Sequence, residues 1–347
     1  MIRITAGVGD LTDSHLRRIT QLGVDAVDLG EGRLLPGVKE RGYPDLDEMV
    51  KIKKRVRSWG LEINRATLPD ISESFMKDEA GTEQELDNAV RSLKVIGDAG
   101  LTMAAQRFEG SNFNHLVTFY RSEHRGGYLG SGGSVWRTGK RPPDLTPEEL
   151  EYAQTGAGGR VTYWPRFAYD EPPGREQLEE WWSHFRRVYD RLVPIAEEYG
   201  IRLGTHPSDI PLPDTPFGSL GFHRIIDAYP SRNVGYIYCC GTRAEAGGLP
   251  LVLDEIHNYG RKGRIFMVHF RNVRGSLATA GGYEEVLLDD GDMNMFKILM
   301  ELRSVGFDGY LNPDHMFPLE GDSADGEQAL AYSVGYIKGL LASLAVV

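Results

Sequence analysis

The stretch Val268-His269-Phe270-Arg271-Asn272-Val273 places a histidine where a short apolar run stops, and three other stretches follow the same pattern. These stretches are Gly204-Thr205-His206-Pro207-Ser208-Asp209, Tyr238-Cys239-Cys240-Gly241 and Asn312-Pro313-Asp314-His315. Each apolar run has the length of a buried strand. Side chains from four successive strands converge only when the strands lie side by side and parallel. The stretches therefore predict a parallel sheet whose strand ends share one edge.

Four copies of one helix-to-strand turn support this sheet: SWG-LEI, DAG-LTM, EYG-IRL and SVG-FDG. In each copy a glycine ends a helix in the left-handed conformation, and a short apolar strand follows. The alternation predicts eight strands with helices between them, over residues 2–5, 25–29, 61–65, 101–105, 201–205, 234–238, 264–268 and 308–312. We therefore expect a (β/α)8 TIM barrel and a single domain over residues 1–347. A doubly wound α/β fold is the alternative, but it usually carries a Gly-rich phosphate turn after its first strand, and AGVGD matches that turn poorly.

Residues 106–174 interrupt this rhythm after the fourth predicted strand, and they are rich in Gly, Pro, Arg and aromatic residues. A loop of this length inside a domain is usually functional or disordered. Because it follows a barrel strand on the catalytic face, we expect a lid or a substrate-shaping insert, with a mobile loop as the alternative. The side chains in it that suit an anion are Arg121, His124, Arg125, Trp136 and Arg137, each of which is also compatible with a solvated surface loop. We take His124 as the substrate-binding candidate.

The composition limits the classes of binding partner that we expect and indicates the cellular compartment. The chain has 347 residues, a formal net charge of −11 and a pI of about 5.4. Nucleic acids and anionic membranes require a basic face, so we expect neither as a partner. The sequence has no N-terminal signal pattern and no long apolar run, and we expect a cytoplasmic protein. Cys239 and Cys240 are adjacent, and a disulfide between neighbours would be strained, which leaves core packing, a metal ligand or a reactive thiol.

The four strand ends carry His206, Cys239, His269 and Asp314. Two imidazoles, a thiolate and a carboxylate form a complete set of ligands for a divalent transition metal. A lone histidine or cysteine would more often be structural, but four such residues in register on consecutive strands favour a metal site. Neighbours in a strand point to opposite sides, so only one cysteine faces the barrel axis, and we assign this place to Cys239. We expect Cys240 to pack against the outer helices.

Three residues near the predicted metal site are candidates for substrate chemistry. Asp209 lies three residues after His206 and is placed to orient that imidazole and to contact the substrate. His315 directly follows Asp314 and is a candidate general acid or base, with a structural hydrogen-bonding histidine as the alternative. Arg271 points to the same side as His269 and is placed to pair with a substrate carboxylate, or alternatively with a carboxylate of the barrel.

The segment 287–295 contains three acids in four residues, Asp289, Asp290 and Asp292. It is typical of the start of a helix, and Asp292 is the expected N-cap. A structural cation bound by these acids is the alternative interpretation.

These motifs resemble the mannonate dehydratase family of the xylose-isomerase-like barrels. The similarity lies mainly in residues 200–316, where HPSD resembles the family's His-Pro-Asp-Asp, YCCG resembles Phe-Cys-Thr-Gly, and VHFRNV, LDDGDMNM and NPDH are close to its signatures. The resemblance assigns the metal ligands to His206, Cys239, His269 and Asp314, and it implies Mn²⁺ as the cofactor. It also assigns the catalytic histidine to His315. The family's catalytic tyrosine is assigned to Tyr332, the nearest candidate after the Asp-His motif.

The resemblance implies removal of water from a sugar acid such as D-mannonate to give a 2-keto-3-deoxy acid. A base, for which Tyr332 is the candidate, would take the proton next to the carboxylate, and His315 would protonate the departing hydroxyl. A metal-dependent sugar isomerase or epimerase on the same barrel and a non-catalytic sugar-binding homologue are the alternatives. We expect a small-molecule sugar acid as the ligand and a homo-oligomer as the assembly.

Overall fold

The computed structural model describes residues 1–111, 113, 117–135, 161–164, 171–208, 212–213, 215–218, 221–323 and 326–346. Eight parallel strands form a closed barrel, in the ring order β1-β2-β3-β4-β8-β9-β10-β13. Their bounds are β1 Arg3–Gly7, β2 Ala26–Leu29, β3 Glu62–Thr67, β4 Met103–Ala105, β8 Arg202–Thr205, β9 Val234–Cys239, β10 Ile265–His269 and β13 Tyr310–Asn312. Each strand overlaps one predicted from the sequence. The TIM barrel is confirmed, and the closure of the sheet excludes the doubly wound alternative.

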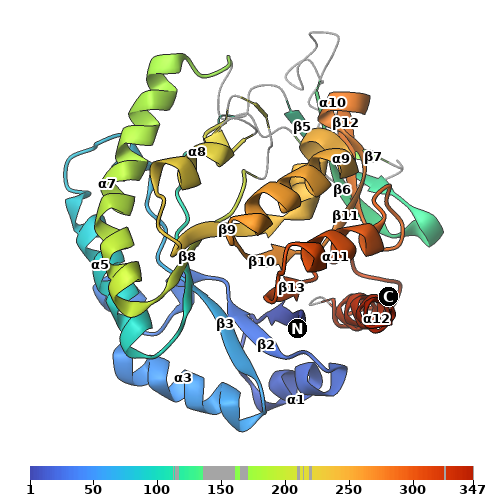
Figure 1. Ribbon diagram of the computed structural model, residues 1–347, viewed down its shortest axis with the longest axis horizontal. Coiled ribbons are helices and arrows are strands. Elements are labelled where there is room, and N and C mark those ends of the chain that lie inside the picture. The colour runs from blue at the N-terminus through green and yellow to red at the C-terminus, as the bar shows by residue number, and fades with distance from the viewer. Residues whose placement is uncertain are drawn as a thin grey trace.

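The helices lie outside the barrel strands (Figure 1). The longer ones are α1 Asp13–Leu22, α3 Leu46–Ser58, α5 Glu83–Asp98, α7 Arg175–Tyr199, α8 Gly221–Ala228, α9 Cys240–Arg261, α11 Met295–Ser304 and α12 Glu327–Leu344. Short helical turns are η1 Gly32–Leu34, α2 Val38–Arg41, α4 Glu73–Met76, η2 Arg125–Gly127 and α10 Leu277–Ala280. The four glycines of the predicted helix-to-strand turns all have a left-handed φ, namely Gly60, Gly100, Gly200 and Gly306. Among the described helices, none combines the length and the apolar character needed to cross a bilayer.

A second, five-stranded antiparallel sheet has the order β11-β12-β6-β5-β7. Its strands are β5 Val117–Glu123, β6 Leu129–Val135, β7 Val161–Trp164, β11 Asn272–Ser276 and β12 Gly282–Val286. Three of them come from the segment 106–174, and two follow β10 directly. In Figure 1 this sheet gathers at the upper right, away from α1 and α3 at the bottom. The described part of the insert therefore contributes three strands, where the sequence predicted a loop.

The glycines of β6 explain why the sequence predicted a loop there. A Cβ on Gly132 would lie 2.7 Å from the Tyr283 carbonyl oxygen, and one on Gly133 would lie 2.8 Å from the Tyr283 ring. Glycine in a strand often marks such a close approach. The composition of β6 thus reflects packing against β12, which local sequence patterns cannot reveal.

Helix α9 starts immediately after β9 and bends at Gly248, whose φ is 70°. A buried ion pair joins the two parts of the helix across this bend. Arg243 donates to both carboxylate oxygens of Glu255 at 2.8 and 2.7 Å, and both side chains are almost completely buried. Tyr238 of β9 donates to the same carboxylate at 3.0 Å. The pair therefore fixes the first turn of α9, which follows Cys239, relative to the rest of the helix.

Replacing Arg243 by Met should lower the free energy of unfolding by about 3–5 kcal/mol, because it leaves the buried Glu255 carboxylate without its charged partner. The double variant Arg243→Met/Glu255→Leu should recover much of this loss. Denaturant unfolding followed by circular dichroism measures both changes, with Arg261→Met on the exposed end of α9 as the control. A loss below about 1 kcal/mol in the single variant would contradict the assignment.

Candidate metal centre and active site

Four potential metal ligands meet at the carboxyl ends of β8, β9, β10 and β13. His206, Cys239, His269 and Asp314 each offer one ligand atom, and these atoms lie within 4.8 Å of one another. The strand register explains the meeting, because His269 is paired with Cys239 on one side and with Asn312 on the other. The sequence prediction that these four side chains converge agrees with the geometry.

The spacing of the donor atoms fits a shared cation. His206 Nε2 lies 3.2 Å from His269 Nδ1, and His269 Nδ1 lies 3.2 Å from Asp314 Oδ2. Ligands bound to one metal at 2.0–2.3 Å stand at about this separation from one another. Cys239 and His269 are buried, whereas His206 and Asp314 are partly exposed. The group is thus enclosed on the barrel side and open toward the mouth.

The two adjacent cysteines have different environments. Cys239 is the N-cap of α9, and its sulfur accepts from the Thr242 N–H at 3.4 Å and the Thr242 hydroxyl at 3.2 Å. Burial opposes ionisation, but Arg271 and the two histidines outweigh it and hold the pKa of the Cys239 thiol well below its usual range. Cys240 donates to the carbonyl of His269 at 3.0 Å, and burial raises its pKa to about 12. Of the two cysteines, only Cys239 lies among the four converging side chains, and only its thiol has a lowered pKa.

Arg271 is the centre of a buried charge network. The guanidinium is enclosed, and Gly241 permits this position, since a Cβ there would lie 2.3 Å from Arg271 Cγ. Its contacts are Cys239 Sγ at 3.2 Å, Thr242 Oγ1 at 2.7 Å, Glu245 Oε1 at 2.7 Å, Glu285 Oε1 at 3.3 Å and Asp314 Oδ2 at 3.7 Å. The alternative weighed for Arg271, pairing with protein carboxylates, is the arrangement found. A contact between Arg271 and a substrate carboxylate stays a prediction from the sequence.

His315 lies at the open side of the cluster, with 40% of its side chain exposed. Its Nδ1 is 2.5 Å from Glu285 Oε2, and its Nε2 is 3.6 Å from Asp314 Oδ2. Burial and Arg271 disfavour its protonated form, but Asp314 and Glu285 outweigh them and raise the pKa of His315 to about 10. Its φ of 50° is left-handed, a conformation that costs a non-glycine residue about 1–3 kcal/mol and is often found at functional sites.

Glu245 is a fully buried carboxylate on the first part of α9. It lies 2.7 Å from Arg271 Nη1, yet neither of its oxygens has hydrogen-bond geometry to a donor among the described residues. Desolvation therefore outweighs the attraction of Arg271, and burial raises the pKa of Glu245 to about 8. The sequence analysis missed both Glu245 and Glu285. Glu285 could have been found only by pairing β11 with β12, which brings a carboxylate back toward Arg271.

The structure does not bring the other predicted residues into the cluster. His124 is buried on the insert sheet, bonded to Ser122 at 3.0 Å and 3.8 Å from Glu284. Since Glu284 and Glu285 are neighbours in β12, their side chains point to opposite faces, and His124 lies on the face away from Arg271. Asp209 lies outside the described residues, as do Trp136 and Arg137.

Tyr332 and the acidic segment also differ from the prediction. Tyr332 interacts with Asp289 and Arg125 at a cavity of about 570 Å³ whose described lining includes none of the four clustered side chains. Arg125 pairs with Asp289 at 2.8 Å and Arg274 pairs with Asp290 at 2.5 Å. The charges of these two acids are therefore balanced by arginine side chains, and a bound metal ion is not needed for this. Asn294, not Asp292, caps α11. Asp292 instead accepts the N–H of Gly275 at 2.8 Å.

Two further cavities differ in their chemistry. A small one of about 150 Å³ beside His206 is lined in part by Gln106 and Ser208, and Gln106 Oε1 and Ser208 Oγ are buried without a hydrogen-bond partner among the described residues. These atoms suit the hydroxyl groups of a polar ligand.

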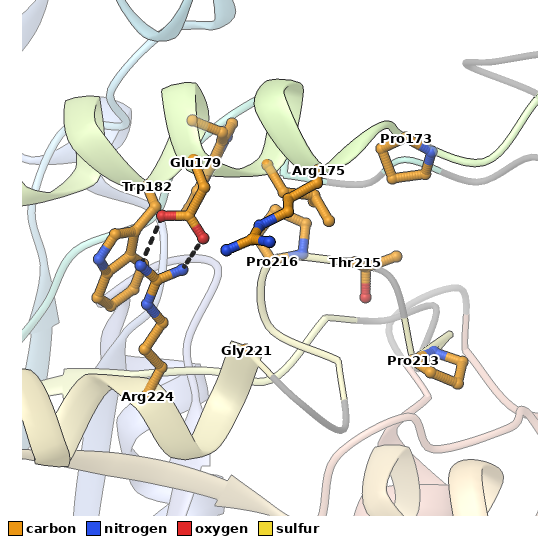
Figure 2. A pocket seen from close by; sticks show the side chains of 11 residues that line it. Pro173, Arg175, Glu179, Trp182, Pro213, Thr215, Pro216, Gly221 and Arg224 are labelled. Atoms are coloured by element: carbon orange, nitrogen blue, oxygen red, sulfur yellow. Dashed lines mark hydrogen bonds and ion pairs between the residues drawn. The ribbon is translucent and has the colours of Figure 1, made fainter.

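Figure 2 shows the other cavity, of about 440 Å³, between α7 and the segment before α8. Arg224 pairs with Glu179 at 2.8 Å and lies over the Trp182 ring, so its charge is already neutralised. The described lining contains none of the four clustered residues, so this cavity is separate from the candidate metal centre.

The chain is similar to known proteins along most of its length. The sequence profile of the D-mannonate dehydratase (UxuA) family matches residues 175–347. Mannonate dehydratase of Geobacillus thermodenitrificans is 25% identical over 92% of this chain and 92% of its own length. Mannonate dehydratase 2 of Halalkalibacterium halodurans is 31% identical over 40% of this chain and 41% of its own length.

Solved structures share the fold. The crystal structure of mannonate dehydratase from Streptococcus suis serotype 2 superimposes with a TM-score of 0.72 at 20% identity, covering 98% of this chain and 92% of that one. A xylose isomerase domain protein from Planctomyces limnophilus gives a TM-score of 0.58 at 12% identity, covering 100% and 99%. These two likenesses concern the fold.

Replacing Glu245 by Gln should change how stability depends on pH in the metal-free protein. The folded pKa of about 8 exceeds the ordinary value of 4.5, so between these pH values the folded chain holds a proton that the unfolded chain has lost. The stability contributed by Glu245 is complete below about pH 4.5 and is lost as the pH rises to about 8.

Wild type should therefore lose stability relative to Glu245→Gln across this window and show no further relative loss above it. Thermal unfolding of both proteins as a function of pH measures the difference, with Glu284→Gln as the control. A pH-independent difference, or one of opposite sign, would disprove the assignment.

Proposed function

The chain belongs to the mannonate dehydratase family, and we propose that it removes water from a sugar acid such as D-mannonate to give a 2-keto-3-deoxy acid. The observation that carries this proposal is the convergence of His206, Cys239, His269 and Asp314, with His315 beside them at the open end of the barrel. The Mannonate dehydratase relatives and the matched family profile support the same reaction.

We propose that the four converging residues hold one divalent transition metal. The donors fit such an ion in number, spacing and chemistry, and Mn²⁺ is the ion to test first because the family resemblance implies it. When bound, the ion supplies Lewis acidity to the oxygen atoms of the substrate. Thr242 and Arg271 hold the Cys239 thiolate in place through bonds to its sulfur, as groups behind metal ligands commonly do.

His315 acts as the general acid in this proposal. The carboxylates of Asp314 and Glu285 favour the protonated form of its imidazole and raise its pKa. It donates this proton to the hydroxyl group that leaves as water, which avoids the departure of hydroxide. Its partial exposure gives the substrate access to the ring.

The polar walls beside His206 suit a polyhydroxylated substrate. Gln106 Oε1 and Ser208 Oγ are buried acceptors without a partner among the described residues, and leaving such groups unpaired costs free energy. We propose that they accept hydrogen bonds from substrate hydroxyls. A sugar acid provides these donors, whereas an apolar ligand does not.

We also propose that the segment 106–174 shapes the substrate site within a single domain. The supporting observation is that its strand β6 pairs with β12, which carries Glu285 to His315. The cytoplasmic location and the homo-oligomeric assembly stay predictions from the sequence.

The reaction can be tested directly. The chain loaded with Mn²⁺ should convert D-mannonate or a related aldonic acid to a 2-keto-3-deoxy acid, detected by mass spectrometry as the loss of one water molecule. A chelator should abolish the reaction, and added metal should restore it. A product isomeric with the substrate would instead identify an isomerase or epimerase, the alternative reaction on this fold.

Replacing His315 by Asn should lower kcat by about 10²–10⁴-fold while leaving the metal content unchanged, because the variant lacks the general acid but keeps the four ligands. Steady-state kinetics and metal analysis of the purified proteins provide the two measurements. His257→Asn, on the exposed side of α9, is the matched control and should behave as wild type. Wild-type turnover by His315→Asn would remove this residue from the mechanism.

A further inference from the structure

The side chain of Glu285 links the second sheet to the proposed general acid. It is 12% exposed, and each of its carboxylate oxygens has its own partner. Oε2 lies 2.5 Å from His315 Nδ1, and Oε1 lies 3.3 Å from Arg271 Nη1. One carboxylate oxygen thus contacts the buried guanidinium, and the other contacts the imidazole.

The backbone around Glu285 is fixed by strand pairing. β11 begins with Asn272, directly after Arg271, and β12 returns antiparallel to it with Glu285 opposite Val273. On its other edge β12 pairs with β6 of the insert. Strand alternation then points Glu285 toward Arg271 and His315, whereas the adjacent Glu284 points to the face that carries His124.

His315 combines an unusual backbone conformation with two ring nitrogens that face different groups. Its left-handed φ of 50° is unusual for a residue with a side chain. The two ring nitrogens face different groups, since Nδ1 contacts Glu285 while Nε2 lies 3.6 Å from Asp314 Oδ2 on the side of the four converging residues. A carboxylate bonded to one ring nitrogen sets which nitrogen is presented to the substrate.

We propose that Glu285 is a positioning residue, which binds Nδ1 of His315 and so presents Nε2 to the departing hydroxyl group. This inference rests on the proposed function, in which His315 is the general acid. The proton moves from Nε2 to the hydroxyl oxygen as the carbon–oxygen bond breaks and water leaves. The imidazole that remains keeps its Nδ1 proton, which Glu285 accepts in a hydrogen bond. Glu285 itself touches neither the substrate nor the reacting atoms.

A double-mutant cycle tests whether Glu285 acts through His315. Glu285→Gln keeps the size of the side chain and should lower kcat by about 10–100-fold, with KM and metal content little changed. In the His315→Asn background the same substitution should cause no further loss, because the group that Glu285 positions is absent. Glu284→Gln, one residue away on the opposite face, should behave as wild type. The proposal is overturned if the losses in kcat of the two single variants multiply in the double variant, or if Glu285→Gln keeps the wild-type kcat.

A structural measurement keeps this test separate from the proposed reaction. Crystal structures of metal-loaded wild type, Glu285→Ala and Glu284→Ala report the orientation of the His315 ring directly. The ring should turn or become disordered in Glu285→Ala and keep its wild-type orientation in Glu284→Ala. An unchanged ring in Glu285→Ala would overturn the positioning role even for an active enzyme. If no aldonic acid is dehydrated by wild type but the ring still depends on Glu285, the proposed reaction fails while the positioning contact stands.

Discussion

The site depends on the ion pairs and hydrogen bonds made by the guanidinium group of Arg271. It is buried at the end of β10 and contacts the Cys239 sulfur and the carboxylates of Glu245, Glu285 and Asp314. A thiolate and several carboxylates enclosed together would repel one another and would be expensive to desolvate. One fixed cation among them lowers this cost and keeps the ligand atoms in place. Arg271 is therefore a structural part of the centre.

The site is assembled from two sheets that share one piece of chain. β10 delivers His269, Arg271 follows at its end, and β11 begins at Asn272. The barrel thus supplies the four converging residues, whereas the hairpin of β11 and β12 supplies Glu285 from the second sheet. Because β12 also pairs with β6, the insert is joined by backbone hydrogen bonds to the strand that contacts His315. The insert is thus connected to the proposed acid through one pair of strands and the Glu285 side chain.

The match to the family profile has the same distribution as the residues of the proposed site. The matched family profile covers residues 175–347, which include all four converging residues, His315 and Glu285. The first half of the chain supplies the remaining barrel strands and interior contacts. There, the buried Asp28 of β2 accepts hydrogen bonds from Thr5, Asn64 and Asn312 and so ties β1 and β3 to β13. The second half holds the reactive groups, and the first half closes the ring that keeps their strands in register.

The sequence alone determined the barrel and the four converging residues, because short-range sequence patterns encode both. Glycines such as Gly200 and Gly306 end helices through their own backbone conformation, and the position of His269 after an apolar run places it at a strand end. Only the tertiary structure decided that Arg271 pairs with protein carboxylates, that His124 and Tyr332 lie elsewhere, and that Glu285 holds His315. These outcomes depend on the antiparallel pairing of β11 with β12 and on the pairing of β12 with β6, which lies far away in the chain. No local periodicity encodes which distant strand becomes the neighbour.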